Sequence, residues 1–261
     1  MRALSTAATG MMAQQRNVEV ISNNIANMNT TGFKRARAEF QDLLYQSERR
    51  AGSLSTDGGD VVPAGVDIGL GVKTAAIARI HTQGSLINTE NRLDLALDGR
   101  GYFIVELPDG EQAYTRAGSF QLSPEGMIVT VDGYEIQPGI AIPQNTVDIQ
   151  INQNGEVMAY VENQMEPDVV GQLNIATFVN DAGLEAIGNN LYRETPASGP
   201  PEEGVPGDMG FGLVRQGWVE ASNVNVVQEI TSLISAQRAY EMNSKALETA
   251  DQMAGTVSNL R

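Results

Sequence analysis

Two apolar stripes, each with alternating spacings of three and four residues, stand at opposite ends of this chain of 261 residues. Such spacing places side chains on one face of a helix that packs lengthwise against another helix. An isolated helix is marginal in water and cannot bury its own apolar face, so each stripe needs a partner. The sequence therefore predicts two terminal helices that pack on each other or on neighbouring subunits. The residues of this predicted assembly seam are Leu4, Met11, Val18, Ile21, Ile25, Met28, Ile230, Leu233, Ala236, Ala239, Asn243, Ala246, Ala250, Met253, Val257 and Leu260.

The limits of the two helices follow from local signals. The first is expected over residues 1–28, because the Asn and Gly residues of 27–32 tolerate the left-handed conformation of a helix stop. The second is expected from about Val224 to Leu260, a stretch without proline. The basic run at 34–37 is expected to complement the negative end of the first helix. Ordinary helices docked on a central domain are the alternative to a seam.

Between the helices the apolar period changes from helical to alternating. Alternation predicts strands at 101–107, 127–131, 147–151, 157–161 and 173–178. Asp132-Gly133 and Asn154-Gly155 separate such runs, and tight hairpin turns with positive φ at both central residues are expected there. No helices alternate with the strands, so the fold class is α+β, with terminal heptad helices pairing as a coiled coil around a central, mostly antiparallel β domain.

Composition shifts suggest four regions. An N-terminal helical polymerisation region is expected at 1–45, an extended arm or linker at 46–65, a central β-rich outer domain at 66–220 and a C-terminal helical polymerisation region at 221–261. The segments 46–65 and 196–212 are rich in Gly, Ser, Pro or charge and are expected to be loops or extended arms. For 46–65, an arm that reaches a neighbour and a passive surface loop are equally compatible with the composition.

Charge and cysteine usage exclude several functional classes. The formal charge is −15, with net values of +3 over 1–50, −17 over 51–220 and −1 over 221–261. Nucleic acid is a poor partner for so acidic a chain, because binding to phosphate backbones depends on clustered Lys and Arg. The chain has no cysteine, which excludes disulfides, thiolate catalysis and sulfur-based zinc sites. Residues 1–17 contain no apolar run that fits a signal peptide, and no segment resembles a membrane span.

No enzyme chemistry is predicted. His81 is the only histidine and has no second imidazole beside it, so it is expected to be a surface or packing residue. Asp94 with Asp98, and Asp57 with Asp60, lack the ligand spacing of a specific calcium loop. We therefore expect no catalytic residue, no cofactor and no metal site. Three classes compete: a structural filament subunit, a secreted glycan-binding β module, and a carboxylate hydrolase.

Residues 22–34, which read SNNIANMNTTGFK, resemble the N-terminal signature of the flagellar rod and hook family. Segments 101–105 and 114–120 resemble that family's central β domain, and 220–226 and 237–245 resemble its C-terminal domain. The resemblance therefore spans the chain. The residues of this family motif are Asn23, Asn24, Ala26, Asn27, Thr31, Gly32, Phe33 and Lys34.

The resemblance implies a structural axial subunit of the bacterial flagellar basal body, exported by the flagellar type III apparatus without a cleaved signal peptide. It implies self-assembly into a helical polymer, contacts with adjacent proximal rod and hook proteins, and rotation inside the P- and L-ring bushings. Chain length and the segment after Tyr45 favour the distal rod, a rigid drive shaft that crosses the periplasm to the outer membrane and transmits torque to the hook. A proximal rod subunit of the same family is the alternative.

Overall fold

A computed structural model describes residues 2–49, 52, 64–162 and 166–259. The chain forms two compact units, each of which draws on separated parts of the sequence. The helical unit contains residues 1–26, 36–79 and 225–261, and the β unit contains 27–35 and 80–224. These limits differ from the expected regions, because residues 66–79 belong with the helices and residues 27–35 with the β unit.

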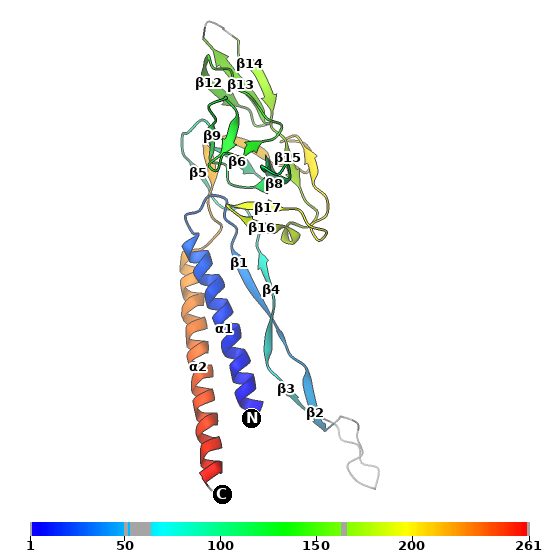
Figure 1. The fold of residues 1–261 in the computed structure, drawn as a ribbon, viewed down its shortest axis with the longest axis vertical. Helices are drawn as coiled ribbons and strands as arrows, with labels where there is room; N and C mark the ends of the chain where they lie inside the picture. The colour runs from blue at the N-terminus through cyan, green and yellow to red at the C-terminus, as the bar shows by residue number, and fades with distance from the viewer. Residues whose placement is uncertain (1, 50–51, 53–63, 163–165, 260–261) are drawn as a thin grey trace. The chain divides into compact units, whose positions relative to one another are not determined.

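The helical unit contains the two terminal helices, α1 (Arg2–Ala26) and α2 (Val226–Asn259). Asn225 caps α2, since its side-chain Oδ1 accepts a hydrogen bond from the Gln228 backbone N–H at 3.2 Å. Figure 1 shows α1 (blue) and α2 (orange to red) side by side, with the chain's N and C ends at the same end of the pair. The expected first helix extended to Met28, but α1 ends at Ala26 and Met28 lies in the following turn.

A two-stranded antiparallel ribbon completes the helical unit. The strand β1 (Ala36–Asp42) pairs with β4 (Val72–Arg79). The next strand, β2 (Tyr45–Arg49), pairs with β3 (Val66–Gly69), which directly precedes β4 in the chain. The helix α1 packs on β1 and β4. The segment expected as a loop or arm at 46–65 thus begins within a strand. Residues 50, 51 and 53–63 of that segment lie outside the described residues.

The β unit contains a nine-stranded antiparallel sheet. Seven of its strands have the order β16-β17-β8-β7-β11-β10-β9, while β15 pairs with β7 and β18 pairs with β15. Its strands are β7 (Tyr102–Glu106), β8 (Gln112–Thr115), β9 (Phe120–Leu122), β10 (Ile128–Thr130), β11 (Glu135–Ile136), β15 (Ile175–Thr177), β16 (Glu185–Gly188), β17 (Leu191–Arg193) and β18 (Glu202–Gly204). The strand β18 lies inside 196–212, where a loop or extended arm was expected.

Smaller sheets complete the β unit. A three-stranded sheet contains β12 (Thr146–Ile151), β13 (Glu156–Val161) and β14 (Asp168–Gln172). Two strand pairs join distant segments: β6 (Leu95–Asp98) with β19 (Leu213–Gln216), and β5 (Leu86–Asn88) with β20 (Trp218–Glu220). A short 3-10 helix, η1 (Asp181–Gly183), follows β15. Strands expected at 101–107, 127–131, 147–151, 157–161 and 173–178 correspond to β7, β10, β12, β13 and β15.

The core of the β unit lies on both faces of β7. Phe103 belongs to one apolar cluster and packs edge-on against Phe120 at a centroid distance of 5.1 Å. Tyr102 and Ile104 point to the opposite face, where a second cluster contains Tyr114. Because successive side chains of a strand alternate between faces, the run GYFIVEL at 101–107 becomes a strand that is buried on both sides.

The glycine hairpins differ from the expected tight turns. Gly133 has φ +87°, while Asp132 is not among the residues with positive φ. Gly133 N–H donates to Thr130 O, and Thr130 N–H donates to Tyr134 O, which closes a three-residue loop. Asn154 and Gly155 repeat this pattern. The expectation of two positive φ values was therefore wrong, because in this longer loop only the last residue needs the left-handed conformation.

Neither described helix contains a segment long and apolar enough to cross a membrane.

Candidate assembly site

The terminal helices pack on each other in antiparallel order. A Cβ built on Gly10 of α1 would lie 3.0 Å from the Nδ2 atom of Asn243 in α2. At the other end of α1, Asn24 Nδ2 donates a hydrogen bond to the Glu229 carboxylate at 3.1 Å. Glycine at position 10 thus permits close approach of the two helices, and residue numbers fall along α2 as they rise along α1.

The predicted seam on α1 is only part of the face that this helix buries. Ile21 is buried, and Leu4, Met11, Val18 and Ile25 are partly buried, whereas Met28 lies beyond the helix and is exposed. Three further positions of α1 are buried and were not predicted: Ala13, Val20 and Asn24. They are buried because α1 contacts both α2 and the ribbon strands β1 and β4, which requires a wider face than a heptad seam.

On α2 the predicted seam is divided between covered and exposed positions. Ala236 is buried, and Leu233, Ala239, Asn243 and Ala250 are partly buried. Ile230, Ala246 and Met253 are exposed, while the Val257 side chain and Leu260 lie outside the described part of the chain. Three other apolar residues of this helix are exposed and were not predicted: Val227, Ile234 and Met242, which are 76%, 46% and 71% exposed. A second, broader apolar stripe around the helix was the signal that could have indicated them.

The ribbon also exposes apolar side chains. Leu44, just before β2, is 82% exposed, and Tyr45 in β2 is 61% exposed. Val66 and Ile68 on the paired strand β3 are exposed as well. An isolated two-stranded hairpin is marginally stable in water. The β2–β3 part of the ribbon therefore offers an apolar surface of the same kind as the exposed face of α2.

The family motif is divided between the two units. Asn23 and Ala26 are exposed on α1, while Asn24 is buried there. In the β unit, Asn27 and Thr31 are partly buried, and Gly32, Phe33 and Lys34 are buried. Gly32 has φ +69°, and a Cβ at this position would lie 2.6 Å from the Ala117 backbone nitrogen. Only glycine fits this close approach without displacing backbone.

Lys34 is the centre of a buried ionic network. Its Nζ donates to the Glu220 carboxylate and, at 2.8 Å, to the Thr82 carbonyl. The Glu220 carboxylate also accepts from Arg116 at 3.2 Å and from the Gly84 N–H at 2.8 Å. Burial lowers the pKa of Lys34 below its ordinary value, and the attraction of Glu220 opposes this shift. Lys34 was expected to complement the end of the first helix, but its charge instead serves an internal ion pair.

Asn223 holds three segments of the β unit together. Its Oδ1 accepts from the Arg35 N–H at 2.8 Å, and its Nδ2 donates to the Ile80 carbonyl at 2.7 Å and to the Thr82 carbonyl at 3.0 Å. Ile80 N–H in turn donates to the Arg35 carbonyl. The segments that follow α1, follow β4 and precede α2 are therefore fixed to one another by Lys34 and Asn223.

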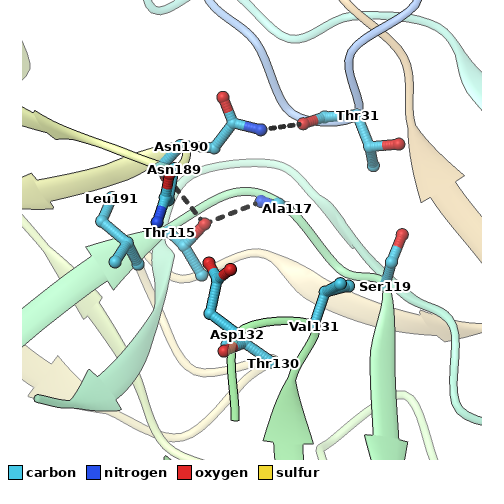
Figure 2. Close-up of a pocket in the computed structure, with 10 residues that line it drawn as sticks. All are labelled: Thr31, Thr115, Ala117, Ser119, Thr130, Val131, Asp132, Asn189, Asn190 and Leu191. Carbon is cyan, nitrogen blue, oxygen red and sulfur yellow. Dashed lines mark hydrogen bonds between the residues drawn. The ribbon is translucent and has the colours of Figure 1, made fainter. Parts of the chain in front are cut away.

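The β unit contains a pocket of about 310 Å³ beneath the turn at Thr31 (Figure 2). Asn190 Nδ2 donates to the Thr31 carbonyl, and the Thr115 hydroxyl donates to the Asn190 carbonyl and accepts from the Ala117 N–H. Asp132 supplies the single carboxylate of the lining, which holds no aromatic ring. The pocket thus lacks both the carboxylate pair of glycoside hydrolysis and an aromatic surface on which a sugar could stack.

The other candidate chemical residues have structural contacts. His81 Nδ1 lies 2.8 Å from the Tyr102 hydroxyl, and the ring packs against Tyr192. Asp94 accepts hydrogen bonds from the side chains of Thr89 and Asn91, and Asp98 pairs with Arg215. Asp57 and Asp60 lie outside the described residues. Within the described chain, no group of three or more His, Asp or Glu side chains could hold a metal ion.

Three protein-family models match separate parts of the chain. Residues 4–34 match "Flagella basal body rod protein", residues 96–159 match "Flagellar hook protein FlgE/F/G D1 domain", and residues 215–260 match "Flagellar basal body rod FlgEFG protein C-terminal". The first match covers most of α1 and the family motif. The third covers β20 and α2, so the matched segments include most of α1 and all of α2.

Whole-chain relatives agree with these matches. The chain is 58% identical over 261 residues to the flagellar basal-body rod protein FlgG of Caulobacter vibrioides, covering 100% of both chains. It is 56% identical over 258 residues to FlgG of Agrobacterium fabrum, covering 99% of this chain and 98% of the relative. Against FlgF of Caulobacter vibrioides the identity is 32% over 256 residues, covering 97% of this chain and 94% of the relative.

Proposed function

The chain belongs to the FlgG family of flagellar basal-body rod proteins, as a structural subunit, and from this premise we propose that it polymerises through its terminal helices into the distal rod. The proximal rod alternative is disfavoured by one comparison: FlgG and FlgF of the same organism, Caulobacter vibrioides, are 58% and 32% identical to this chain.

The observation that carries this proposal is the unequal burial of α2. One side of the helix packs on α1, while Val227, Ile230 and Ile234 expose apolar side chains. Burying apolar surface is favourable by about 25 cal/mol per Å², so contacts between copies of this face would stabilise an assembly. In a helical polymer such contacts are heterologous and do not close into a ring.

In the assembled rod, α1 and α2 form a coiled coil near the axis, and the acidic β unit forms an outer layer. The alternation of threes and fours on both helices supports this arrangement, and so does the net charge of −17 over residues 51–220, because like-charged outer parts repel and stay in solvent. The ribbon with segment 46–65 acts as an arm that contacts neighbouring subunits, for which the exposed Leu44 and Tyr45 supply apolar surface.

The wider setting rests on family membership. We infer a rigid drive shaft that transmits torque to the hook, flanked by proximal rod and hook proteins and turning inside the P- and L-ring bushings. The subunit would reach this place across the periplasm through the flagellar type III export apparatus, without a cleaved signal peptide. Rod, hook and basal-body domain matches support the adjacent rod and hook proteins as partners.

Electron microscopy of concentrated purified protein tests self-assembly. We expect tubes of uniform diameter from the wild-type chain and none from Ile230→Asp, which would place a carboxylate in a contact between copies. Ser232→Asp is the matched control, because Ser232 is exposed on the same helix and its replacement adds the same negative charge. Absence of tubes from the wild-type chain, or equal assembly of the two variants, would contradict polymerisation through this face.

A further inference from the structure

Asn24 joins three elements of the helical unit through one side-chain amide. The side chain is 1% exposed. Its Oδ1 accepts from the Ala36 N–H at 2.9 Å, and its Nδ2 donates to the Ala36 carbonyl at 2.8 Å, so the amide pairs with the first residue of β1 as a neighbouring strand would. The same Nδ2 also donates to Glu229 Oε2 of α2 at 3.1 Å.

The contact at Gly10 alone does not select the pairing of α1 and α2. Asn243 of α2 lies opposite Gly10, and the positions one heptad before and after it are Ala236 and Ala250. Alanine is smaller than asparagine, so a slide of α2 by one heptad in either direction would still leave a small side chain opposite Gly10. The space at Gly10 therefore does not discriminate between these registers.

The buried amide discriminates strongly. A slide by one heptad would move Glu229 away from Asn24 and leave a buried polar group with fewer partners, which costs free energy. A single buried polar residue in a helix pair fixes register in this way, at some cost in stability.

We propose that Asn24, through its hydrogen bond to Glu229, specifies the register of α1 against α2 together with the short connection that leads from Asn223 into α2. The pair with Ala36 fixes the rotation of the Asn24 amide, so its second N–H is directed at α2. The proposal deepens the proposed assembly function, because the register decides which apolar side chains of α2 stay exposed for neighbouring copies.

The absence of native cysteine makes the register directly measurable by disulfide formation. Gly10→Cys with Asn243→Cys reports the observed register, because Asn243 is the residue whose side chain a Cβ on Gly10 would contact. Gly10→Cys with Ala236→Cys, and Gly10→Cys with Ala250→Cys, report the two slides by one heptad. Oxidation, followed by denaturing electrophoresis without reductant, separates disulfides within a subunit from those between subunits.

Each cysteine pair is placed in four backgrounds: wild type, Asn24→Leu, Asn24→Leu with Glu229→Leu, and Val20→Ile. The double variant removes the Glu229 carboxylate together with the Asn24 amide. It therefore avoids burying a carboxylate that has lost this partner, which could by itself prevent folding. Val20→Ile is the matched control, because it alters a buried apolar residue of the same helix that lies outside the predicted seam. The full-length chain is oxidised both as free subunits and after polymerisation.

In the wild-type and Val20→Ile backgrounds we expect the Gly10–Asn243 pair to form most of the intramolecular disulfide. In both Asn24 backgrounds we expect part of that yield to be lost and the two shifted pairs to gain it, because the connection from Asn223 still favours the observed register. An unchanged distribution in the double variant, or equal yields at all three pairs in the wild type, would overturn the proposal. Failure of the wild type to polymerise while the free subunits keep the Gly10–Asn243 disulfide would instead contradict the proposed function and leave the register assignment supported.

Discussion

The Lys34 ammonium and the Glu220 carboxylate form an ion pair that solvent does not reach, with side chains 1% and 0% exposed. The pair joins the segment that follows α1 to the strand that precedes α2, across 186 residues of sequence. Removing two charges from water is costly, and the hydrogen bonds from Arg116 and Gly84 and to the Thr82 carbonyl offset that cost. The ion pair thus joins the first and the last parts of the chain in the β unit, near residues 34 and 220.

Lys34→Met is expected to destabilise the β unit by about 3–5 kcal/mol, because it leaves a buried carboxylate without its closest cation. Urea unfolding followed by Trp218 fluorescence measures this, since Trp218 is the only tryptophan and lies in β20 two residues before Glu220. Arg193→Met is the control, because it breaks an exposed ion pair with Glu185 and is expected to cost about 0–1 kcal/mol. Equal losses in the two variants would contradict a special role of the buried pair.

Gly32→Ala is expected to destabilise the β unit by more than the ~1–3 kcal/mol of backbone strain alone, because the new Cβ would also meet the backbone of Arg116 and Ala117. Gly110→Ala separates the two effects. Gly110 has φ +81° but no atom within 4 Å of its built Cβ, so this variant carries strain without a clash. If the free energy of unfolding falls equally in Gly32→Ala and Gly110→Ala, the turn at Gly32 moves to accommodate the new methyl group.

The two helices and the central strands were predictable because periodicity is a local property. The role of Lys34 was not, since a basic run beside Arg35 and Arg37 reads as surface charge, and its partner is remote in sequence. Asn24 lay one position from the predicted seam residue Ile25. Its burial follows from the packing of α1 on β1 and β4, and no pattern within residues 1–28 indicates that contact.

Tyrosine burial is expected to make the β unit unstable at high pH. Burial, assisted by the nearby Glu194 and Glu203, raises the pKa of Tyr114 from 10.0 to about 12, and burial also raises the pKa of Tyr102. The unfolded chain then releases protons that the folded chain retains. Stability is therefore unaffected by these groups below pH 10 and falls between pH 10 and about 12, by about 1.4 kcal/mol per pH unit for each group.

Lys34 acts in the opposite direction, because its lowered pKa adds stability as pH rises toward 10.5, so the net fall is expected above that pH. Urea unfolding at a series of pH values, with tyrosinate absorbance measured in parallel, tests this. Tyr114→Phe should flatten the fall, because it removes one of the buried hydroxyls. A Tyr114→Phe profile identical to the wild-type profile would contradict this account.

Ile25→Asp is expected to abolish polymerisation while leaving Trp218-detected unfolding of the β unit unchanged. Ile25 is partly buried on α1, and a carboxylate in a helix contact without a partner is costly. Ile25→Leu is the control, because it keeps an apolar side chain of the same size. Filaments formed equally well by Ile25→Asp would mean that this position lies outside the assembly contact, and the predicted seam would then be out of register.

Replacing residues 50–64 by a short Asn-Gly turn is expected to yield rods that are more flexible or more curved. The turn closes the β2–β3 hairpin, so the paired base of the ribbon is preserved, and surface loops change folding stability little. Charged side chains of this arm would make exposed ion pairs with neighbours worth only ~0–1 kcal/mol each, but the contact repeats along the lattice. A variant with residues 50–64 in scrambled order keeps the length of the arm but changes its contacts. If specific contacts of the arm stiffen the rod, this variant should give flexible rods. If the arm acts only as a spacer, the rods should stay straight. Bending stiffness from filament images decides, and equal stiffness in all three chains would reduce the arm to a linker.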